Sequence, residues 1–309
     1  MNPLVIYHAN CADGFTAAWA VHKAMPADFY PAFYQALPPD VAGRDVIMVD
    51  FCYNADVMLQ LQRSARSMLV LDHHKTADEV LAPDPRIKPA YLTVHRIDGT
   101  PECGIANWTD FKNAAGWDRD EGITKAVIYA LIDQQRSGAG IAWDFFHPGV
   151  PRPALVNHVE DRDLWRFALP GTREIQAAIF SRPYTFEAWD AMAAMDPAEL
   201  QREGVVLERK HHKDVAELVA TCQRRIVISG HDVPAASIPH TMTSDAGALM
   251  ARGEHFAACY WDTAHAREFS LRSTADGLDV SLVASLYGGG GHARAAGFRV
   301  PRTHELARA

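Results

Sequence analysis

The chain has 309 residues, of which 30 are basic and 38 acidic, giving a formal charge of −8. Its composition, 48% apolar and 22% charged, is that of a globular protein and excludes disordered and collagen-like classes. The negative net charge excludes a protein that binds long duplex nucleic acid through a basic surface. No apolar run is long enough to predict a membrane span.

The chain begins without the basic flank and apolar run of a signal peptide. No two cysteines form a C-x-x-C pair, which excludes a zinc finger. We therefore expect a cytoplasmic protein with reduced thiols. The cysteines are Cys11, Cys52, Cys103, Cys222 and Cys259.

Short apolar runs alternate with helical patterns in the first part of the chain. Residues 4–7, 46–49 and 68–71 are apolar runs typical of buried parallel strands, and helical spacing follows at 15–24 and 53–65. This alternation predicts an α/β fold with an open parallel sheet and right-handed crossovers. Ligands of such sheets bind beyond the carboxyl ends of the strands.

A polar stretch with several glycines and prolines, about residues 98–122, is interpreted as an insertion or lid without an assigned role. Its Trp108 and Trp117 are candidates for stacking on a nucleobase. Strand character resumes at 126–132, and Ser137 is placed to cap the helix that follows.

A charged helical stretch separates this region from shorter alternating segments at 225–228, 257–261 and 268–272 and a final helix at 280–286. We expect a smaller α/β domain at the C-terminus, joined to the first domain through a helical connector. The expected limits are 1–195 for the first domain, 196–225 for the connector and 226–309 for the C-terminal substrate-binding domain.

Polar residues follow each of the first three predicted strands, at positions 8–13, at Asp50 and at 72–74. Because the carboxyl ends of parallel strands share one edge of a sheet, we expect these side chains to converge. Carboxylates and imidazoles without paired thiols suit Mn²⁺ or Mg²⁺. Such crowded carboxylates would repel one another without cations, and the set is large enough for two ions.

Five segments, in this order, resemble the DHH phosphoesterase family with its C-terminal DHH-associated domain. The C-terminal pattern is similar to that of the nuclease and oligoribonuclease branch. The segments are HANCADGF at 8–15, VD at 49–50, LDHHK at 71–75, VEDRDLW at 159–165 and GGGHARAAGF at 289–298.

The resemblance implies a centre with two divalent cations, with Mn²⁺ favoured and Mg²⁺ or Co²⁺ also suitable. Asp50 would bridge the ions, and His73 and Asp161 would complete the second site. The implied metal ligands are His8, Asp13, Asp50, His73 and Asp161.

Two positions leave alternatives open. Asp161 is preferred to Asp163 because the family's aspartate precedes an aromatic residue, here Trp165, by four positions. Cys11 stands where the family usually has another aspartate. A thiolate ligand would move the preference toward Zn²⁺, Fe²⁺ or Co²⁺, but we prefer the alternative that Cys11 is a small buried residue.

The resemblance also implies that His74 faces the substrate phosphate as a hydrogen-bond or proton donor, and that Asp72 orients a histidine or a water molecule. Backbone N–H groups of a glycine run can approach a phosphate closely, and an arginine can hold it with two hydrogen bonds. The predicted substrate-binding residues are Arg272, Ser273, Gly289, Gly290, Gly291 and His292.

Together these residues predict a metal-dependent phosphohydrolase or phosphodiesterase in which hydroxide, formed between two ions, attacks phosphorus. The expected substrate is a short oligonucleotide or a (di)nucleotide, and we expect neither a long duplex nor a membrane as a partner. The alternatives are an exopolyphosphatase or pyrophosphatase, and a non-catalytic nucleotide- or RNA-binding protein. The sequence leaves the oligomeric state open, a homodimer included.

Overall fold

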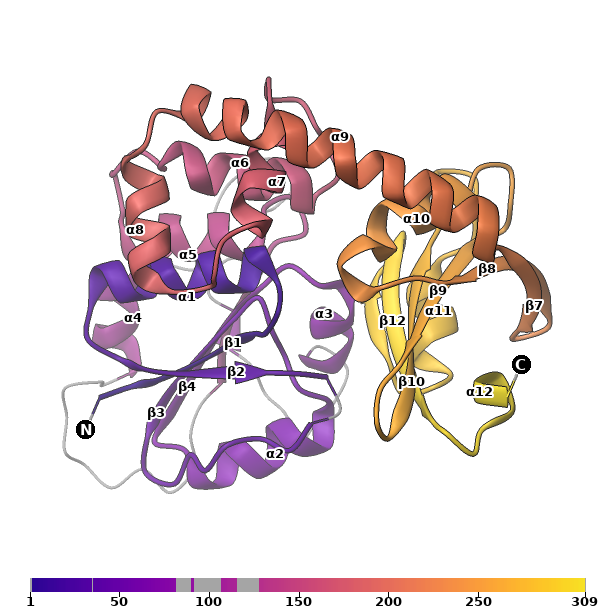
Figure 1. Ribbon diagram of the computed structural model, residues 1–309. Helices are drawn as coiled ribbons and strands as arrows, with labels where there is room; N and C mark the ends of the chain where they lie inside the picture. Colours follow the sequence, from indigo (N-terminus) through magenta and orange to yellow (C-terminus); the bar gives the residue numbers. More distant parts are fainter. Residues whose placement is uncertain (1, 35, 82–89, 92–106, 116–127, 309) are drawn as a thin grey trace. The chain divides into compact units, whose positions relative to one another are not determined.

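The chain divides into two compact units, Met1–Val205 and Val206–Ala309, and each contains a sheet of its own in the computed structural model (Figure 1). Among the described helices, none is both long enough and apolar enough to cross a membrane. The structure describes residues 2–34, 36–81, 90–91, 107–115 and 128–308.

A parallel sheet forms the centre of the N-terminal unit, with its six strands in the order β2-β1-β3-β4-β6-β5. The predicted strands at 4–7, 46–49 and 68–71 are confirmed as β1, β3 and β4, which are neighbours in the sheet. The strands are β1 (Leu4–His8), β2 (Asp28–Ala32), β3 (Asp45–Val49), β4 (Ser67–Asp72), β5 (Ala90–Tyr91) and β6 (Ile128–Ile132).

Strand β2 was not predicted from the sequence. Among the described strands it pairs only with β1, at the edge of the sheet, and it is mostly half-buried or exposed. It therefore lacks a continuous apolar run, and it contains Pro31, which edge strands tolerate.

Helices cover both faces of this sheet, and side chains along each central strand alternate between two apolar cores. Val5 and Ile47 belong to one core, whereas Ile6 and Met48 belong to the other. Helix α2 lies on the face opposite α1 and α5 (Figure 1). The helices are α1 (Ala12–Ala24), α2 (Ala55–Ser64), α3 (Lys75–Leu81), α4 (Trp108–Ala115), α5 (Gly138–Phe146), α6 (Ala154–Asp163), α7 (Thr172–Phe180) and α8 (Phe186–Ala194).

The predicted insertion at 98–122 contains helix α4 in its described part, where a polar loop was expected. Phe111 of this helix is fully buried. The Trp108 ring packs against Phe111 and Phe146, with centroid separations of 5.4 and 5.1 Å. Trp108 is half-buried and packs against the core of the unit, and its role in base stacking stays a prediction. Trp117 lies outside the described residues.

Helix α9 (Pro197–Cys222) follows α8 and contains the division between the two units, after Val205. The sequence predicts a connector at 196–225, which matches the span of this helix, whereas the two compact units divide within the helix.

The C-terminal unit contains a mixed sheet in the order β11-β12-β10-β9-β8-β7, in which only β8 and β9 are parallel among the described strands. The strands predicted at 225–228, 257–261 and 268–272 are confirmed as β7, β9 and β10. The elements are β7 (Arg224–Ile228), β8 (His231–Ser237), α10 (Thr243–Met250), β9 (Ala257–Asp262), β10 (Ala266–Arg272), α11 (Val280–Ser285), β11 (Gly290–His292), β12 (Ala295–Pro301) and α12 (Glu305–Arg308).

Candidate metal centre

Polar side chains meet at the carboxyl edge of the parallel sheet, as the strand pattern predicted. His8 ends β1, Asp50 follows β3, and Asp72 ends β4. Helices add to the same edge, because Asp13 lies in the first turn of α1 and Asp163 is the last residue of α6.

Three carboxylates surround one imidazole nitrogen in this cluster. His73 Nε2 lies 3.1 Å from Asp50 Oδ1, 3.5 Å from Asp163 Oδ2 and 3.6 Å from Asp13 Oδ2. Burial, followed by the charges of Asp50 and Asp163, raises the pKa of Asp13 well above its usual value. Burial also raises the pKa of Asp163. Charging all three carboxylates around this histidine is therefore unfavourable, and a bound cation would offset that cost.

The N-terminus of α5 fixes the carboxylate of Asp13. The backbone N–H of Gly138 donates to Oδ2 at 2.6 Å, and that of Ala139 donates to Oδ1 at 3.0 Å. A helix N-terminus favours a negative charge at this position. A Cβ atom at residue 138 would lie 2.5 Å from Asp50 Cβ and 2.9 Å from Asp13 Oδ2, so the close approach requires glycine.

Asp50 adopts a left-handed backbone conformation, with φ of 54°, which is unusual for a residue other than glycine and frequent at functional sites. Its backbone N–H donates to the carbonyl of Leu71 on β4 at 2.9 Å. Burial alone would raise the pKa of Asp50, but the interactions with His73 and His8 hold it well below its usual value. The two histidines therefore favour the charged form of the Asp50 carboxylate at the centre of the cluster.

Several buried polar atoms of the cluster have no hydrogen-bond partner among the described residues. They include His8 Nδ1, Asp50 Oδ2 and Asp163 Oδ2. His8 Nδ1 and Asp50 Oδ2 are 3.5 Å apart without a hydrogen bond between them. Buried polar atoms are normally satisfied, and coordination of a metal ion would satisfy these.

Two sets of three residues at the sheet edge could each hold a metal ion. In each group one ligand atom per residue lies within 4.8 Å of the others. One group contains Asp13, His73 and Asp163, and the other contains His8, Cys11 and Asp50. The donor types and burial fit divalent cations, and two ions could be held side by side.

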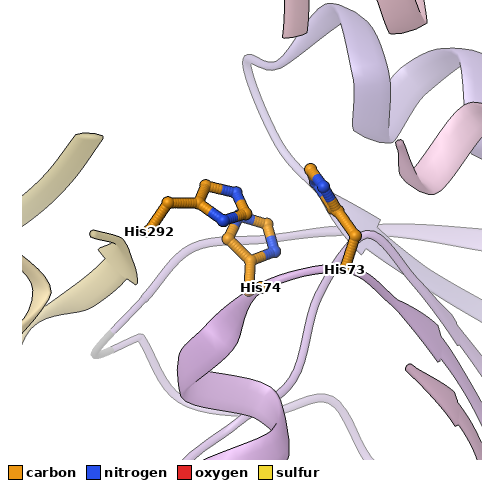
Figure 2. A group of neighbouring side chains, drawn as sticks. All are labelled: His73, His74 and His292. Atoms are coloured by element: carbon orange, nitrogen blue, oxygen red, sulfur yellow. The ribbon is translucent and has the colours of Figure 1, made fainter. Parts of the chain in front are cut away.

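His73 and His74, which follow β4 (Figure 2), have different hydrogen-bond partners. Asp72 Oδ1 accepts the backbone N–H groups of His73 at 2.7 Å and of His74 at 3.2 Å, and lies 2.7 Å from His74 Nδ1. Asp72 therefore orients the His74 ring. Burial alone would lower the pKa of His74, but the carboxylate of Asp72 raises it above its usual value. The third histidine in Figure 2, His292, belongs to β11 of the C-terminal unit.

The structure places Asp163 at this centre and engages Asp161 elsewhere. Asp161 accepts the backbone N–H groups of Ala168 at 2.8 Å and Leu169 at 3.1 Å, and the Thr172 hydroxyl at 2.6 Å. Its carboxylate thus holds the turn between α6 and α7. The preference for Asp161 as a ligand is therefore reversed, because both of its oxygens already bind this turn.

Comparisons with known proteins bear on the fold. No family model matches the chain. It is 26% identical over 326 residues to uncharacterized protein R106 of Acanthamoeba polyphaga mimivirus, an alignment that covers 95% of the chain and 66% of the relative. The chain therefore spans just under two thirds of that relative's length.

The structure is similar to the DHH domain of a member of a family of ribosomal proteins. The TM-score is 0.51 at 13% identity, over 99% of this chain and 85% of the other. This chain has the DHH-domain fold. Two weaker similarities are to the pGpG-specific phosphodiesterase PggH from Vibrio cholerae (TM-score 0.43, 13% identity, 100% and 96% coverage) and to RecJ with Mg²⁺ from Thermus thermophilus (TM-score 0.42, 16% identity, 99% and 48% coverage).

Tyr34 is a residue of this candidate metal centre that the sequence did not indicate. Its ring lies against His8, with centroids 5.2 Å apart, and against Phe51, at 4.9 Å. Burial, followed by the charge of Asp72, raises the pKa of Tyr34 well above its usual value. Tyr34 follows the unpredicted strand β2, so no pattern in the sequence placed it beside His8.

The predicted arginine and serine of the C-terminal unit have local partners. The guanidinium group of Arg272 donates to the Ser270 hydroxyl at 3.0 Å, the Leu271 carbonyl at 2.8 Å and the Ser244 hydroxyl at 2.8 Å. The Ser273 hydroxyl donates to the Ala293 carbonyl at 3.3 Å. Their role in substrate binding stays a prediction.

The glycine run of this DHH-domain chain has a structural cause that the sequence did not indicate. Residues 290–292 form β11, paired with β12. A Cβ atom at Gly289 would lie 2.0 Å from the carbonyl oxygen of Gly297, and one at Gly291, where φ is 137°, would lie 2.6 Å from that of Ala295. Close approach to β12 therefore requires glycine at both positions. Phosphate binding by Gly289, Gly290, Gly291 and His292 stays a prediction.

Proposed function

We propose that this DHH-domain protein is a divalent-metal-dependent phosphohydrolase that cleaves phosphodiester bonds in short oligonucleotides or (di)nucleotides. The observation that carries the proposal is the buried cluster in which Asp13, Asp50 and Asp163 surround His73 Nε2 at 3.1–3.6 Å. Three carboxylates this close around one histidine are a costly arrangement in the absence of metal cations. They are the ligands expected for Mn²⁺ or Mg²⁺ in an oxygen-rich site.

Asp13, His73 and Asp163 would hold one ion, His8 would contribute to the other, and Asp50 lies where it can serve both groups. When bound, divalent ions lower the pKa of a water nucleophile and neutralise charge on phosphoryl oxygens. The residues of the chain fix this geometry beforehand, since the N–H groups of α5 hold Asp13 and the left-handed backbone at residue 50 aims the central carboxylate.

His74 is proposed as the proton donor of the reaction. The Asp72 carboxylate, 2.7 Å from His74 Nδ1, stabilises the imidazolium form and raises its pKa. A positively charged ring can donate a hydrogen bond to a phosphoryl oxygen or a proton to the leaving oxygen. Asp72 would act through His74 as a positioning residue.

An exposed ring near the end of α6 supports a nucleotide as the substrate. Trp165 is 40% exposed and has a left-handed backbone with φ of 56°. The guanidinium groups of Arg162 and Arg173 lie 5.1 and 5.8 Å from its centroid. Aromatic rings beside arginines bind bases by stacking and phosphates by charge. Pyrophosphate and polyphosphate have no base, so this feature favours the nucleotide over the exopolyphosphatase or pyrophosphatase alternative.

The proposal is tested by hydrolysis with metal-free protein to which Mn²⁺ is returned. The substrates are a short single-stranded RNA, a linear dinucleotide, pyrophosphate and polyphosphate. We expect Mn²⁺-dependent cleavage of the RNA or the dinucleotide. Asp50→Asn should lower the rate by a factor on the order of 10³ or more, because several kcal/mol of charge stabilisation is removed.

Asp40→Asn is the matched control, because Asp40 is exposed and its Oδ1 accepts the backbone N–H of Ala42, a bond that asparagine can also accept. This variant should hydrolyse the substrates at the wild-type rate. Phosphate release from pyrophosphate or polyphosphate alone would favour the alternative enzyme. Nucleotide binding with neither hydrolysis nor metal binding would favour the non-catalytic alternative.

A further inference from the structure

Cys11 lies at the N-terminus of α1, on the side of the centre that contains His8. It is the N-cap residue of the helix, yet its side chain makes no capping hydrogen bond within the described part of the chain. Its Sγ atom is within 4.8 Å of ligand atoms of His8 and Asp50. The thiol thus faces the metal cluster instead of the helix that it begins.

Its two neighbours supply an independent indication of a ligand. Asp50 is 1% exposed, and its Oδ2 atom has no hydrogen-bond partner among the described residues. The Nδ1 atom of His8 is also buried and has no hydrogen-bond partner among the described residues. Three donors of different types therefore converge, one from β1, one from the N-cap of α1 and one after β3. His8 Nδ1 and Asp50 Oδ2 pair at 3.5 Å, too far for a hydrogen bond.

We propose that Cys11, as a thiolate, coordinates the ion held by His8 and Asp50, and that this position selects a softer divalent metal such as Zn²⁺, Fe²⁺ or Co²⁺. The proposal rests on the proposed metal centre and names the metal class of one of its two positions. As the sulfur–metal bond forms, the thiol proton passes to solvent, and no atom changes its oxidation state.

The geometry allows this coordination with side-chain movements. Metal–sulfur and metal–nitrogen bonds of about 2.3 and 2.0 Å place the ligand atoms of a tetrahedral site about 3.5 Å apart. The three ligand atoms lie within 4.8 Å of one another, so coordination requires shifts of at most about one ångström by comparison with that spacing.

The second group of ligands differs in chemistry, and this difference makes the proposal specific. Asp13, His73 and Asp163 contain no sulfur, so they suit a hard ion such as Mn²⁺ or Mg²⁺. The two positions would then hold unlike metals. A carboxylate in place of the thiolate would make both positions hard.

The test is a titration of metal-free wild-type protein with Co²⁺, followed by absorption spectroscopy. Thiolate-bound Co²⁺ gives an intense near-ultraviolet charge-transfer band, whereas Co²⁺ with only oxygen and nitrogen ligands does not. We expect the band in the wild type and its loss in Cys11→Ser and Cys11→Asp. Cys11→Asp should also shift the relative affinity from Co²⁺ toward Mn²⁺ by on the order of tenfold or more.

Cys52→Ser is the matched control. Cys52 is buried in the same unit, but its Sγ lies 3.4 Å from the Tyr53 carbonyl, so the band should persist. Alkylation of the wild type, measured by peptide mass spectrometry, gives a readout that needs no variant. Co²⁺ or Zn²⁺ should protect Cys11 from modification, and Mg²⁺ should not.

The outcomes separate this proposal from the proposed function. Binding of Co²⁺ to the wild type without a charge-transfer band, or a band that persists in Cys11→Ser, would overturn the thiolate ligand and leave the metal-dependent hydrolase standing. Failure of the wild type to bind Co²⁺ and Mn²⁺ at all would overturn both.

Discussion

Asp161 and Asp163 lie two positions apart on α6, and their carboxylates have different partners. Asp163 Oδ2 is 3.5 Å from His73 Nε2, whereas Asp161 binds two backbone N–H groups and the Thr172 hydroxyl in the turn after the helix. One aspartate therefore lies in the candidate metal centre, and the other stabilises the local fold.

This difference predicts opposite effects for two matched substitutions. Asp163→Asn should weaken Mn²⁺ binding by on the order of ten- to a hundredfold with little loss of stability. Asp161→Asn should lower the free energy of unfolding by about 1–3 kcal/mol and retain Mn²⁺ binding. Calorimetric metal titration and urea unfolding measure both quantities. Loss of Mn²⁺ affinity in Asp161→Asn alone would restore the assignment made from the sequence.

The pH dependence of the same pair adds a second readout. Burial alone would raise the pKa of Asp161, but Thr172, Ala168 and Leu169 hold it below its usual value. A lowered folded-state pKa gives stability that is fully present above the unfolded pKa of about 3.9 and is lost as pH falls through the folded value. The stability difference between the wild type and Asp161→Asn should therefore shrink in that acid range. A difference that does not change with pH would argue against a charged Asp161.

The residue scale also shows where prediction from sequence reached its limit. His8, Asp13, Asp50 and His73 were correctly expected to converge, because they follow strands that share one sheet edge. Asp161 and Asp163 could not be separated, since only the path of the chain after α6 decides which carboxylate meets the turn. Whether the Cys11 thiol faces the cluster also depends on the rotation of α1, which spacing does not determine.

At the scale of elements, the N-termini of helices and close glycine contacts position the centre. Gly14 of α1 lies so close to β1 that a Cβ atom would be 2.4 Å from the His8 carbonyl oxygen. Gly138 of α5 is similarly close to the centre, because a Cβ atom there would lie 2.5 Å from Asp50 Cβ and 2.9 Å from Asp13 Oδ2. The helices can approach the strand ends only because these two side chains are absent.

The close approach of Gly138 to Asp50 and Asp13 predicts that Gly138→Ala weakens metal binding, because the added methyl group would displace one of these carboxylates. We expect Mn²⁺ affinity to fall by on the order of tenfold or more. Gly43→Ala is the control. Its φ is 66°, and no described atom lies within 4 Å of the place that a Cβ atom would take, so it should cost about 1 kcal/mol of stability and leave the affinity unchanged. Equal Mn²⁺ affinity in the two variants would contradict the role of Gly138.

Elements with a strong local pattern could be predicted, and those fixed by tertiary contacts could not. Strands β1, β3 and β4 are continuous apolar runs because both faces of the sheet are covered. Strand β2 and helix α4 lack such runs, since the first lies at an edge and the second buries only Phe111 fully among its side chains described at 108–113. The glycine-rich β11 is a strand because β12 pairs with it, which its own sequence does not reveal.

At the scale of the whole molecule, the net charge of −8 depends on where the acidic residues lie. Part of the acidity is buried at the end of one sheet, where bound cations would create a local positive field. The net charge is thus compatible with a small anionic substrate, although it disfavours a broad surface for long nucleic acid. The fold supports this centre, and the chemistry depends on its side chains.

The central claim is that this sheet edge holds two divalent ions. Anomalous diffraction from crystals of the full chain grown with Co²⁺ tests it most directly. We predict two anomalous peaks, one in contact with Asp13, His73 and Asp163 and the other with His8 and Asp50. An absence of peaks at these carboxylates, while Co²⁺ occupies other positions in the same crystals, would contradict the claim.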